Sequence, residues 1–161
     1  MRIGYGTSVT VPSQQERWIS ELAAARAFAS GTFLAPSAGN FGEIQLFNPV
    51  ASGKTIAIYR ALACAQTINA IRYRLFNTAL ATLVGTGVNL LSGGAAAVGE
   101  LRTNIPAALD GTQILICNVL NFDPYGQPQV WLAQLAAGQG FLVTTNAVND
   151  GLTANFYWNE F

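Results

Sequence analysis

The sequence predicts an all-β protein: an antiparallel β-sandwich with jelly-roll topology, preceded by a short N-terminal α-helical arm. Three observations lead to this fold class. Hydrophobic residues recur with a helical period near the N-terminus and with a period of two after Gly31. Short strand-like segments then follow one another, separated by clusters of Gly, Pro, Asn and Asp. The sequence has no repeat of fixed period, which argues against a solenoid or propeller. We therefore expect an arm over residues 1–30 and a β-sandwich domain over residues 31–161.

The arm is predicted to contain one amphipathic helix, from Ser13 to about Ala29. Ser13-Gln14-Gln15-Glu16 has the spacing of a capping box, which satisfies the first free amide groups of a helix. Apolar residues then recur at helical spacing with charged residues between them. These apolar residues are Trp18, Ile19, Leu22, Ala23 and Ala25. Ser30-Gly31 is expected to end the helix.

The sandwich is predicted to contain eight or nine strands, depending on whether Thr78–Leu83 forms one, and a short further strand is left open. The nine are Gly31–Ala35, Glu43–Phe47, Lys54–Ala63, Asn69–Phe76, Thr78–Leu83, Thr112–Leu120, Gln129–Leu135, Gln139–Thr145 and Leu152–Trp158. The short one is Glu100–Arg102. In the last strand we expect Leu152, Ala154, Phe156 and Trp158 to face the core, because alternate side chains of a strand share a face.

Two other segments suggest contacts beyond a simple sandwich. Thr112–Leu120 is apolar on both faces, which predicts a strand in a sheet covered on both sides, by the helix or by another subunit. Val84–Asp110 is rich in glycine and small residues and is predicted to be mostly irregular. Long loops of this kind usually have a function or pack against a neighbour.

The composition argues against catalysis and favours association. The chain of 161 residues has no histidine, eight acidic and eight basic residues, and 51% hydrophobic residues. Most enzymes move protons with histidine, clustered carboxylates or cysteine, and here these groups are absent or scattered. The lack of histidine also removes the side chain that usually titrates between pH 5 and 8. A net charge of zero gives no electrostatic attraction to nucleic acid and little repulsion between copies. We expect no enzyme activity, no cofactor and no nucleic-acid partner.

The remaining motifs have simple structural interpretations. Ser52-Gly53-Lys54-Thr55 is like the end of a phosphate-binding loop, but Asn48 stands where the motif needs glycine, so a hairpin turn is preferred. Cys64 and Cys117 are interpreted as buried free thiols, with a disulfide or a metal pair as the alternative. No apolar run is long enough to span a membrane, and the N-terminus lacks the apolar stretch of a secretory signal. We expect synthesis in the cytoplasm and no membrane partner.

Several segments together resemble small virion structural proteins of tailed bacteriophages. The pieces are Leu46-Phe47-Asn48-Pro49 with Ser52-Gly53-Lys54, Asn89–Gly94, Gly99–Arg102, Ala137–Val143 and the closing Leu152–Glu160, which ends Trp-x-Glu. The similarity is one of pattern and covers about residues 31–161. Such proteins include head decoration (cement) proteins with jelly-roll folds and tail or fibre proteins with similar sandwiches. The resemblance implies location in the virion, and no catalytic residues come with it.

We therefore expect a non-enzymatic capsid decoration protein that stabilises the head lattice, with the major capsid protein as its main partner. A homo-oligomer, dimer or trimer, is expected from the large apolar content. The candidate interface residues are Trp18, Leu22, Phe28, Leu90, Leu91, Leu115, Val119 and Trp131. For the arm residues Trp18, Leu22 and Phe28 the alternative is packing on the chain's own sandwich. The alternative functions are a tail, baseplate or fibre component that contacts receptors, and a carbohydrate-binding module.

Overall fold

The fold is known from a computed structural model, which describes residues 20, 21, 23–67, 70–118 and 133–161, without the side chains of residues 115–118. These residues form eleven β-strands. The strands are β1 (Ala27–Leu34), β2 (Glu43–Phe47), β3 (Ile56–Ala65), β4 (Ala70–Leu75), β5 (Thr82–Thr86), β6 (Val88–Asn89), β7 (Glu100–Asn104), β8 (Thr112–Asn118), β9 (Gln134–Leu135), β10 (Gly140–Thr145) and β11 (Leu152–Glu160). The prediction of an all-β protein is therefore confirmed.

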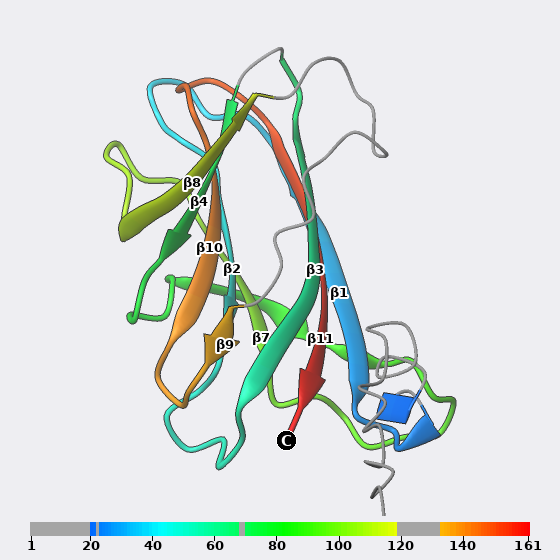
Figure 1. The fold of residues 1–161 in the computed structure, drawn as a ribbon. Coiled ribbons are helices and arrows are strands. Elements are labelled where there is room, and N and C mark those ends of the chain that lie inside the picture. Colours follow the sequence, from blue (N-terminus) through cyan, green and yellow to red (C-terminus); the bar gives the residue numbers. More distant parts are fainter. Residues whose placement is uncertain (1–19, 22, 68–69, 119–132) are drawn as a thin grey trace, which may run out of the picture.

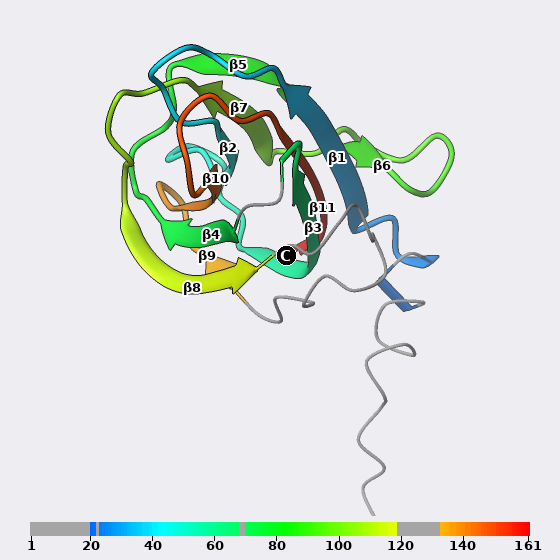
Figure 2. The same ribbon diagram turned by 90° about the horizontal axis from the view of Figure 1, so that it is seen from above.

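The strands form two antiparallel sheets that face each other (Figure 1). One sheet has five strands in the order β6-β1-β11-β3-β9, and the other has six in the order β5-β7-β2-β10-β4-β8. Seen along the strands, both sheets curve around a common interior (Figure 2). The architecture is thus sandwich-like, with apolar side chains between the two layers.

The early and late strands pair in a nested pattern. β1 pairs with β11, β2 with β10, β3 with β9 and β4 with β8, each pair antiparallel. Successive pairs lie in alternate sheets. β5, β6 and β7 belong to the connection between β4 and β8. β6 extends the five-stranded sheet beyond β1, and β7 and then β5 extend the six-stranded sheet beyond β2. The first and second halves of the chain therefore run antiparallel as one long strand pair, which folds over itself to form the two sheets.

The last strand shows how the sequence pattern produces this core. Leu152, Ala154, Phe156 and Trp158 are all fully buried, and the residues between them are half-buried. The predicted inward face of this strand is confirmed. β11 lies between β1 and β3, so that its inward side chains cross the middle of the five-stranded sheet.

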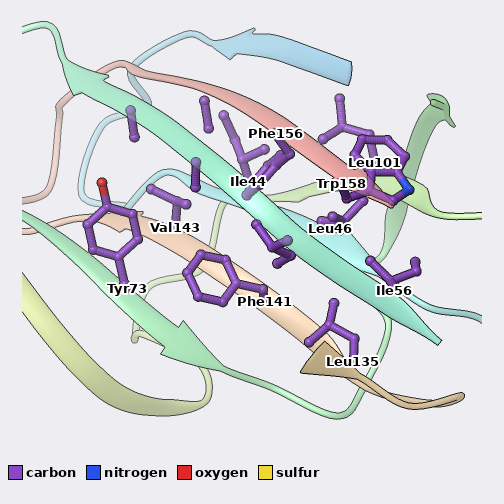
Figure 3. Packing of buried hydrophobic residues seen from close by; sticks show 14 of the residues in the cluster. Ile44, Leu46, Ile56, Tyr73, Leu101, Leu135, Phe141, Val143, Phe156 and Trp158 are labelled. Atoms are coloured by element: carbon purple, nitrogen blue, oxygen red, sulfur yellow. The ribbon is translucent and has the colours of Figure 1, made fainter. Parts of the chain in front are cut away.

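Aromatic side chains link the two sheets across the core (Figure 3). The Phe28 ring stacks on Trp158 with 6.0 Å between centroids. Phe141 lies 5.9 Å from Tyr73 on the neighbouring strand and meets Phe156 of the other sheet edge to face at 6.3 Å. These separations lie in the range in which aromatic pairs add about 0.5–1.5 kcal/mol beyond their burial.

The outer face of the six-stranded sheet is covered by the chain itself. Every residue of β2 is buried, although alternate side chains point away from the core. The Gln45 amide donates to the carbonyls of Phe76 and Thr78, both at 3.0 Å, and its oxygen accepts from the Leu80 amide at 3.0 Å. These bonds hold residues 76–80 as a loop across the sheet. This explains why the strand that was predicted at Thr78–Leu83 begins only at Thr82.

The predicted position of the C-terminal end of the N-terminal helix, about Ala29, is wrong. Ser20, Glu21 and Ala23 have helical backbone, and the Ala24 amide donates to the Ser20 carbonyl at 3.0 Å. Ala25 then takes a left-handed conformation with φ 57°, and β1 begins at Ala27. Ala27–Ala29 pair with β11, so long-range strand pairing overrides local helical periodicity. Residues 13–19 and Leu22 lie outside the described part of the chain.

Two other expectations about strands change. The Val84–Asp110 segment is mostly irregular, as predicted, but besides the expected short strand near Glu100 it contains the end of β5 and all of β6. β8 was expected in a sheet covered on both sides, but it lies at the sheet edge beside β4, and Ile114 is 48% exposed. One face of β8 is therefore open in the described chain, and cover of this face by another subunit stays a prediction. Of the predicted strand Gln129–Leu135, only Ala133–Leu135 fall within the described residues.

Candidate assembly interface

One continuous segment joins the two sheets along one side of the sandwich. β5 forms the edge of the six-stranded sheet next to β7, and after Gly87 the chain continues as β6, the edge of the five-stranded sheet next to β1. Both views show this segment crossing from one sheet to the other (Figures 1 and 2). We call residues 82–91, from the start of β5 through Leu91, the closing ribbon.

The crossing is possible because residue 87 has no side chain. A Cβ atom at Gly87 would lie well inside 3.0 Å of the Trp158 ring, a separation that real Cβ atoms essentially never show. The ribbon backbone therefore rests directly on the largest buried side chain of the core. The Gly87 amide also donates to the Gly99 carbonyl at 3.2 Å, which ties the ribbon to the start of β7.

Asn89 fixes the far end of the closing ribbon. Its side-chain amide donates to the carbonyls of Ala25 and Ala95, both at 2.9 Å, and its oxygen accepts from the Leu91 amide at 2.9 Å. The Leu90 amide donates to the Ala27 carbonyl at 2.9 Å. Backbone bonds and one amide side chain thus hold Leu90 and Leu91 in place, while their side chains are left outside the core.

A buried carboxylate holds the segment to which the Gly87 amide is bonded. Glu160 accepts hydrogen bonds from the amides of Val98 and Gly99 and from the indole N–H of Trp158, at 2.9–3.1 Å. The side chain of Glu160 therefore joins the end of β11 to the segment that leads into β7. This contact gives a structural reason for the closing Trp-x-Glu pattern of the sequence.

The outward side of the ribbon is apolar and uncharged. Val88 is 69% exposed, Leu83 51%, Val84 47%, and Leu90 and Leu91 41% each. No charged residue occurs in the sequence between Arg74 and Glu100. Native proteins usually protect edge strands with charges or proline, and β5 has only a bulge between Leu83 and Gly85. Five exposed apolar side chains within one edge segment are the property of an interaction site.

The structure brings together only two of the predicted interface residues. Leu90 and Leu91 lie side by side in the closing ribbon and are exposed. Phe28 is 4% exposed and stacks on Trp158, so of its two alternatives the structure shows packing on the chain's own sandwich. The backbone of Leu115 lies in β8, and its side chain is outside the description, as are Trp18, Leu22, Val119 and Trp131.

The list of candidate interface residues did not include Leu83, Val84 and Val88, although Val84 and Val88 belong to the segment Val84–Asp110 that was expected to contact a neighbour. Their local pattern looks like an ordinary half-buried strand, in which one of two faces meets a core. The available signal was the long interval without charge, which the prediction of a glycine-rich, mostly irregular segment did not use. An interval without charge together with β-branched residues and no proline is typical of an unprotected strand edge.

A second feature lies on the covered face of the six-stranded sheet and concerns pH. The buried Glu43 carboxyl accepts a hydrogen bond from the Asp110 amide at 2.9 Å. Arg74 donates to the carbonyls of Asp110 and Gly111, which holds the same loop. Burial, and to a lesser extent the nearby Asp110 carboxylate, raise the pKa of Glu43 from 4.5 to about 7, against the opposing effects of the Asp110 amide and Arg74. The chain therefore has a group that titrates near neutral pH although it has no histidine.

The arginines on β4 are used within the fold. Besides the Arg74 contacts, Arg72 donates to Asn146 Oδ1 at 2.7 Å and to Gln113 Oε1 at 3.4 Å. These bonds connect β4 with the β10–β11 turn and with β8.

The segment that is like a phosphate-binding loop is a turn. Asn48, which stands where that motif needs glycine, donates to the carbonyls of Lys54 and Leu135, both at 2.9 Å. A turn and then strand β3 follow it, which agrees with a turn in place of a phosphate-binding loop. The prediction of a hairpin is wrong, because β2 and β3 belong to different sheets and the turn carries the chain from one sheet to the other.

An open cleft lies where β4 and β8 approach β9 and β10. Its volume is about 480 Å³, and no charged side chain lines it. The lining residues are Leu75, Phe76, Asn77, Gly111, Thr112, Gln134, Leu135 and Gln139. Its chemistry is that of neutral amide and hydroxyl groups beside one aromatic ring.

Two further searches of the described residues gave no site. These residues contain no group of three or more Cys, Asp and Glu side chains that could hold a metal ion. In the described parts of the chain, no helix has the length and hydropathy needed to cross a bilayer. Cys64 is a half-buried free thiol on β3.

Comparisons with the models of protein families, with curated proteins and with solved structures found no match to this chain.

Proposed function

We propose that this protein is a non-enzymatic structural component of a bacteriophage virion, a capsid decoration protein that stabilises the head lattice. The observation that carries the proposal is the closing ribbon, an exposed apolar and uncharged surface held rigidly on the edge of a closed sandwich. Such a surface is suited to contact with other protein chains and offers no group for chemistry.

The strand order supports a jelly-roll topology for this component. A jelly roll is an eight-stranded double sheet in which the chain forms two Greek keys. The four nested pairs described above supply eight strands, in the sheet orders β1-β11-β3-β9 and β2-β10-β4-β8. β5, β6 and β7 are then an insertion between the fourth and fifth strands of the roll. The closing ribbon belongs to this insertion, outside the part that forms the roll.

The buried ionisable groups support a structural role. Glu43 binds the loop before β8, and Glu160 binds the segment before β7. Arg74 and Arg72 fasten turns at the ends of the six-stranded sheet. Each of these groups joins one part of the fold to another, which is what a component of a permanent assembly needs.

The stabilising mechanism is mass action. A protein that binds only the assembled lattice lowers the free energy of that lattice by the free energy of its binding. Many copies with modest affinity act together on a shell, because each bound copy links neighbouring subunits. We assign contact with the major capsid protein to the arm that precedes β1, and contact within the decoration layer to the closing ribbon.

Cryo-electron microscopy of purified virions of the phage that encodes the protein tests this proposal. Density of the two-sheet fold on the head lattice supports decoration. Density confined to the tail contradicts decoration and supports the tail or fibre alternative. Absence of the protein from purified particles contradicts a structural role in the virion altogether.

A variant pair makes the same test sharper. Leu90→Asp and Leu91→Asp together place charge on the closing ribbon, and Val50→Asp places charge on a more exposed turn elsewhere. We expect the ribbon variant to be incorporated at least about tenfold less than wild type, since a like-charge contact costs one to several kcal/mol. Equal incorporation of both variants contradicts a role for the ribbon.

One observation favours a second function, carbohydrate binding. The open cleft combines Phe76 with the amides of Asn77, Gln134 and Gln139, and neutral amides beside an aromatic ring suit a sugar. A glycan array probed with the isolated protein tests this alternative, with Gln139→Ala as the variant. Sugar binding that this variant abolishes supports it, and the absence of sugar binding removes it.

A further inference from the structure

The closing ribbon leaves one edge of β5 open to a further strand. β5 pairs with β7 on one side, and within the described residues its other side pairs with no strand. Thr82, Leu83, Val84 and Thr86 are exposed. An edge of this kind presents a row of free amide and carbonyl groups, so its natural ligand is another extended strand.

We propose that a second copy of this chain covers this edge, with two β5 strands antiparallel about a two-fold axis at Val84. The proposal rests on the proposed role of the closing ribbon as an assembly surface and goes further by naming its occupant. A two-fold contact uses the same patch on both copies, so the patch must be complementary to itself.

The sequence of β5 meets this requirement. Val84 is the bulged residue of β5, because Leu83 and Gly85 pair with successive residues of β7. An antiparallel pair centred on Val84 places Leu83 opposite Gly85 of the other copy and Thr82 opposite Thr86. A Cβ at Gly85 would have no atom within 4 Å, so there is free space into which the opposing Leu83 side chain fits. Threonine pairs across strands are also favourable in antiparallel sheets.

The absence of charged residues in the closing ribbon permits a contact between two copies and does not favour a charged partner. The chain carries eight basic and eight acidic residues, and none lies in the ribbon. Two copies therefore meet without like-charge repulsion. A partner recognised by electrostatic complementarity would need charged groups at this edge.

The exposed area is close to what a specific dimer needs. The five apolar side chains of the ribbon expose roughly 400 Å² in each copy, from their exposed fractions. Only Leu83 and Val84 of these five lie on β5, and the others lie on or after β6 at the edge of the other sheet. When the contact covers β6 as well as β5 with Thr82 and Thr86, the two copies together bury about 1,000 Å², at the lower limit of specific interfaces. The dimer is therefore expected to have a dissociation constant in the micromolar range, about 1–50 µM.

Sedimentation equilibrium of the full chain and of two lysine variants tests the inference. Val84→Lys places two positive charges opposite each other at the two-fold axis, and we expect at least tenfold weaker dimerisation. Val50→Lys is the matched control, because Val50 is 78% exposed and lies in the turn after β2. The control is expected to dimerise like wild type, and the thermal unfolding of both variants is expected to stay like wild type.

A cysteine variant tests the register and does not depend on the effect of a new charge. With Val84→Cys, mild oxidation is expected to produce a disulfide between position 84 of one copy and position 84 of the other, which mass spectrometry of the non-reduced digest identifies. Val50→Cys under the same conditions is expected to give no 50–50 link.

Two results would overturn the inference. One is a wild-type protein that stays monomeric at about 100 µM, well above the expected dissociation constant. The other is a dimer that Val84→Lys leaves intact and that forms no 84–84 link. Neither result contradicts the proposed function, because cryo-electron microscopy of the virion tests that function independently. If the protein is then found on the head lattice, the closing ribbon contacts a different protein of the particle.

Discussion

Gly87 offers the sharpest test of how the closing ribbon is attached to the core. The missing side chain makes room for the Trp158 ring, and a Cβ there would also lie 3.1 Å from the Cβ of Ala97. Trp158 has little freedom to move, because it is fully buried, stacks on Phe28 and donates its indole N–H to Glu160 at 3.0 Å. Gly87→Ala must therefore displace either the ribbon or the centre of the core.

The expected cost follows from these contacts. An extra methyl group in a well-packed core typically costs about 1–3 kcal/mol. If the ring moves, the hydrogen bond to the Glu160 carboxylate weakens, which adds up to about 1.5–3 kcal/mol. We expect Gly87→Ala to lower the free energy of unfolding by about 3 kcal/mol. Gly85→Ala, two residues away, is the control, because a Cβ there meets nothing within 4 Å. Its expected effect is within about 0.5 kcal/mol of zero, or slightly stabilising.

Urea unfolding and thermal melting of the two variants at one low protein concentration provide the measurement. For a chain of this size, 3 kcal/mol corresponds to a decrease in Tm of roughly 6–12 °C. The urea slope should be unchanged, because both variants expose the same surface on unfolding. If Gly87→Ala unfolds like wild type, or Gly85→Ala is equally damaging, the close packing of the ribbon on Trp158 is refuted.

Three other predictions concern the groups that hold the fold together. The pKa of Glu43 is raised from 4.5 to about 7, so the native state binds one more proton than the unfolded state between these pH values. The free energy of unfolding should therefore be highest below about pH 4.5 and fall by at most about 3 kcal/mol as pH rises through 7. Urea titrations at pH 5 and pH 8 check this, and Glu43→Gln should remove the difference; an equal pH dependence in the variant would contradict the assignment. Glu160→Gln replaces a carboxylate oxygen that accepts backbone N–H groups with an amide donor, and denaturant unfolding should show a loss of about 2–3 kcal/mol. Phe28→Ala should cost about 3–5 kcal/mol, as its ring is in the core, and Phe33→Ala on the same strand less than about 1 kcal/mol, as Phe33 is 54% exposed; similar losses would place Phe28 outside the core.

The strands that alternate cleanly were predicted well because their pattern is local. Glu43–Phe47 has the predicted bounds, and the inward face of β11 is as predicted. Both strands pair on two sides within their sheets, so burial and periodicity agree.

The failures have long-range causes. Ala27–Ala29 look helical in sequence, and pairing with β11 makes them a strand. Residues 76–80 look like part of a strand, and the Gln45 side chain from β2 holds them as a loop. In each case a residue far away in the sequence decides the local conformation. A short stretch of sequence around the segment does not contain that residue, so its local pattern cannot reveal the outcome.

The candidate interface was predicted in part for the same reason. Leu90 and Leu91 were selected from a segment rich in glycine and apolar residues, and they are exposed. Phe28 was selected from a helical face and lies against Trp158. Hydrophobicity indicates that a side chain avoids water, but only packing decides whether its cover is the same chain or another one.

The sequence by itself determined the all-β class, the low charge and the shortage of groups for chemistry, because composition and period two are properties of the chain alone. The tertiary structure decided which edge remains open, since β5 becomes an edge only when the two sheets are assembled and Gly87 lets the ribbon pass over Trp158. It also decided that Glu43 titrates near neutral pH, because burial beneath the loop before β8 exists only in the folded protein.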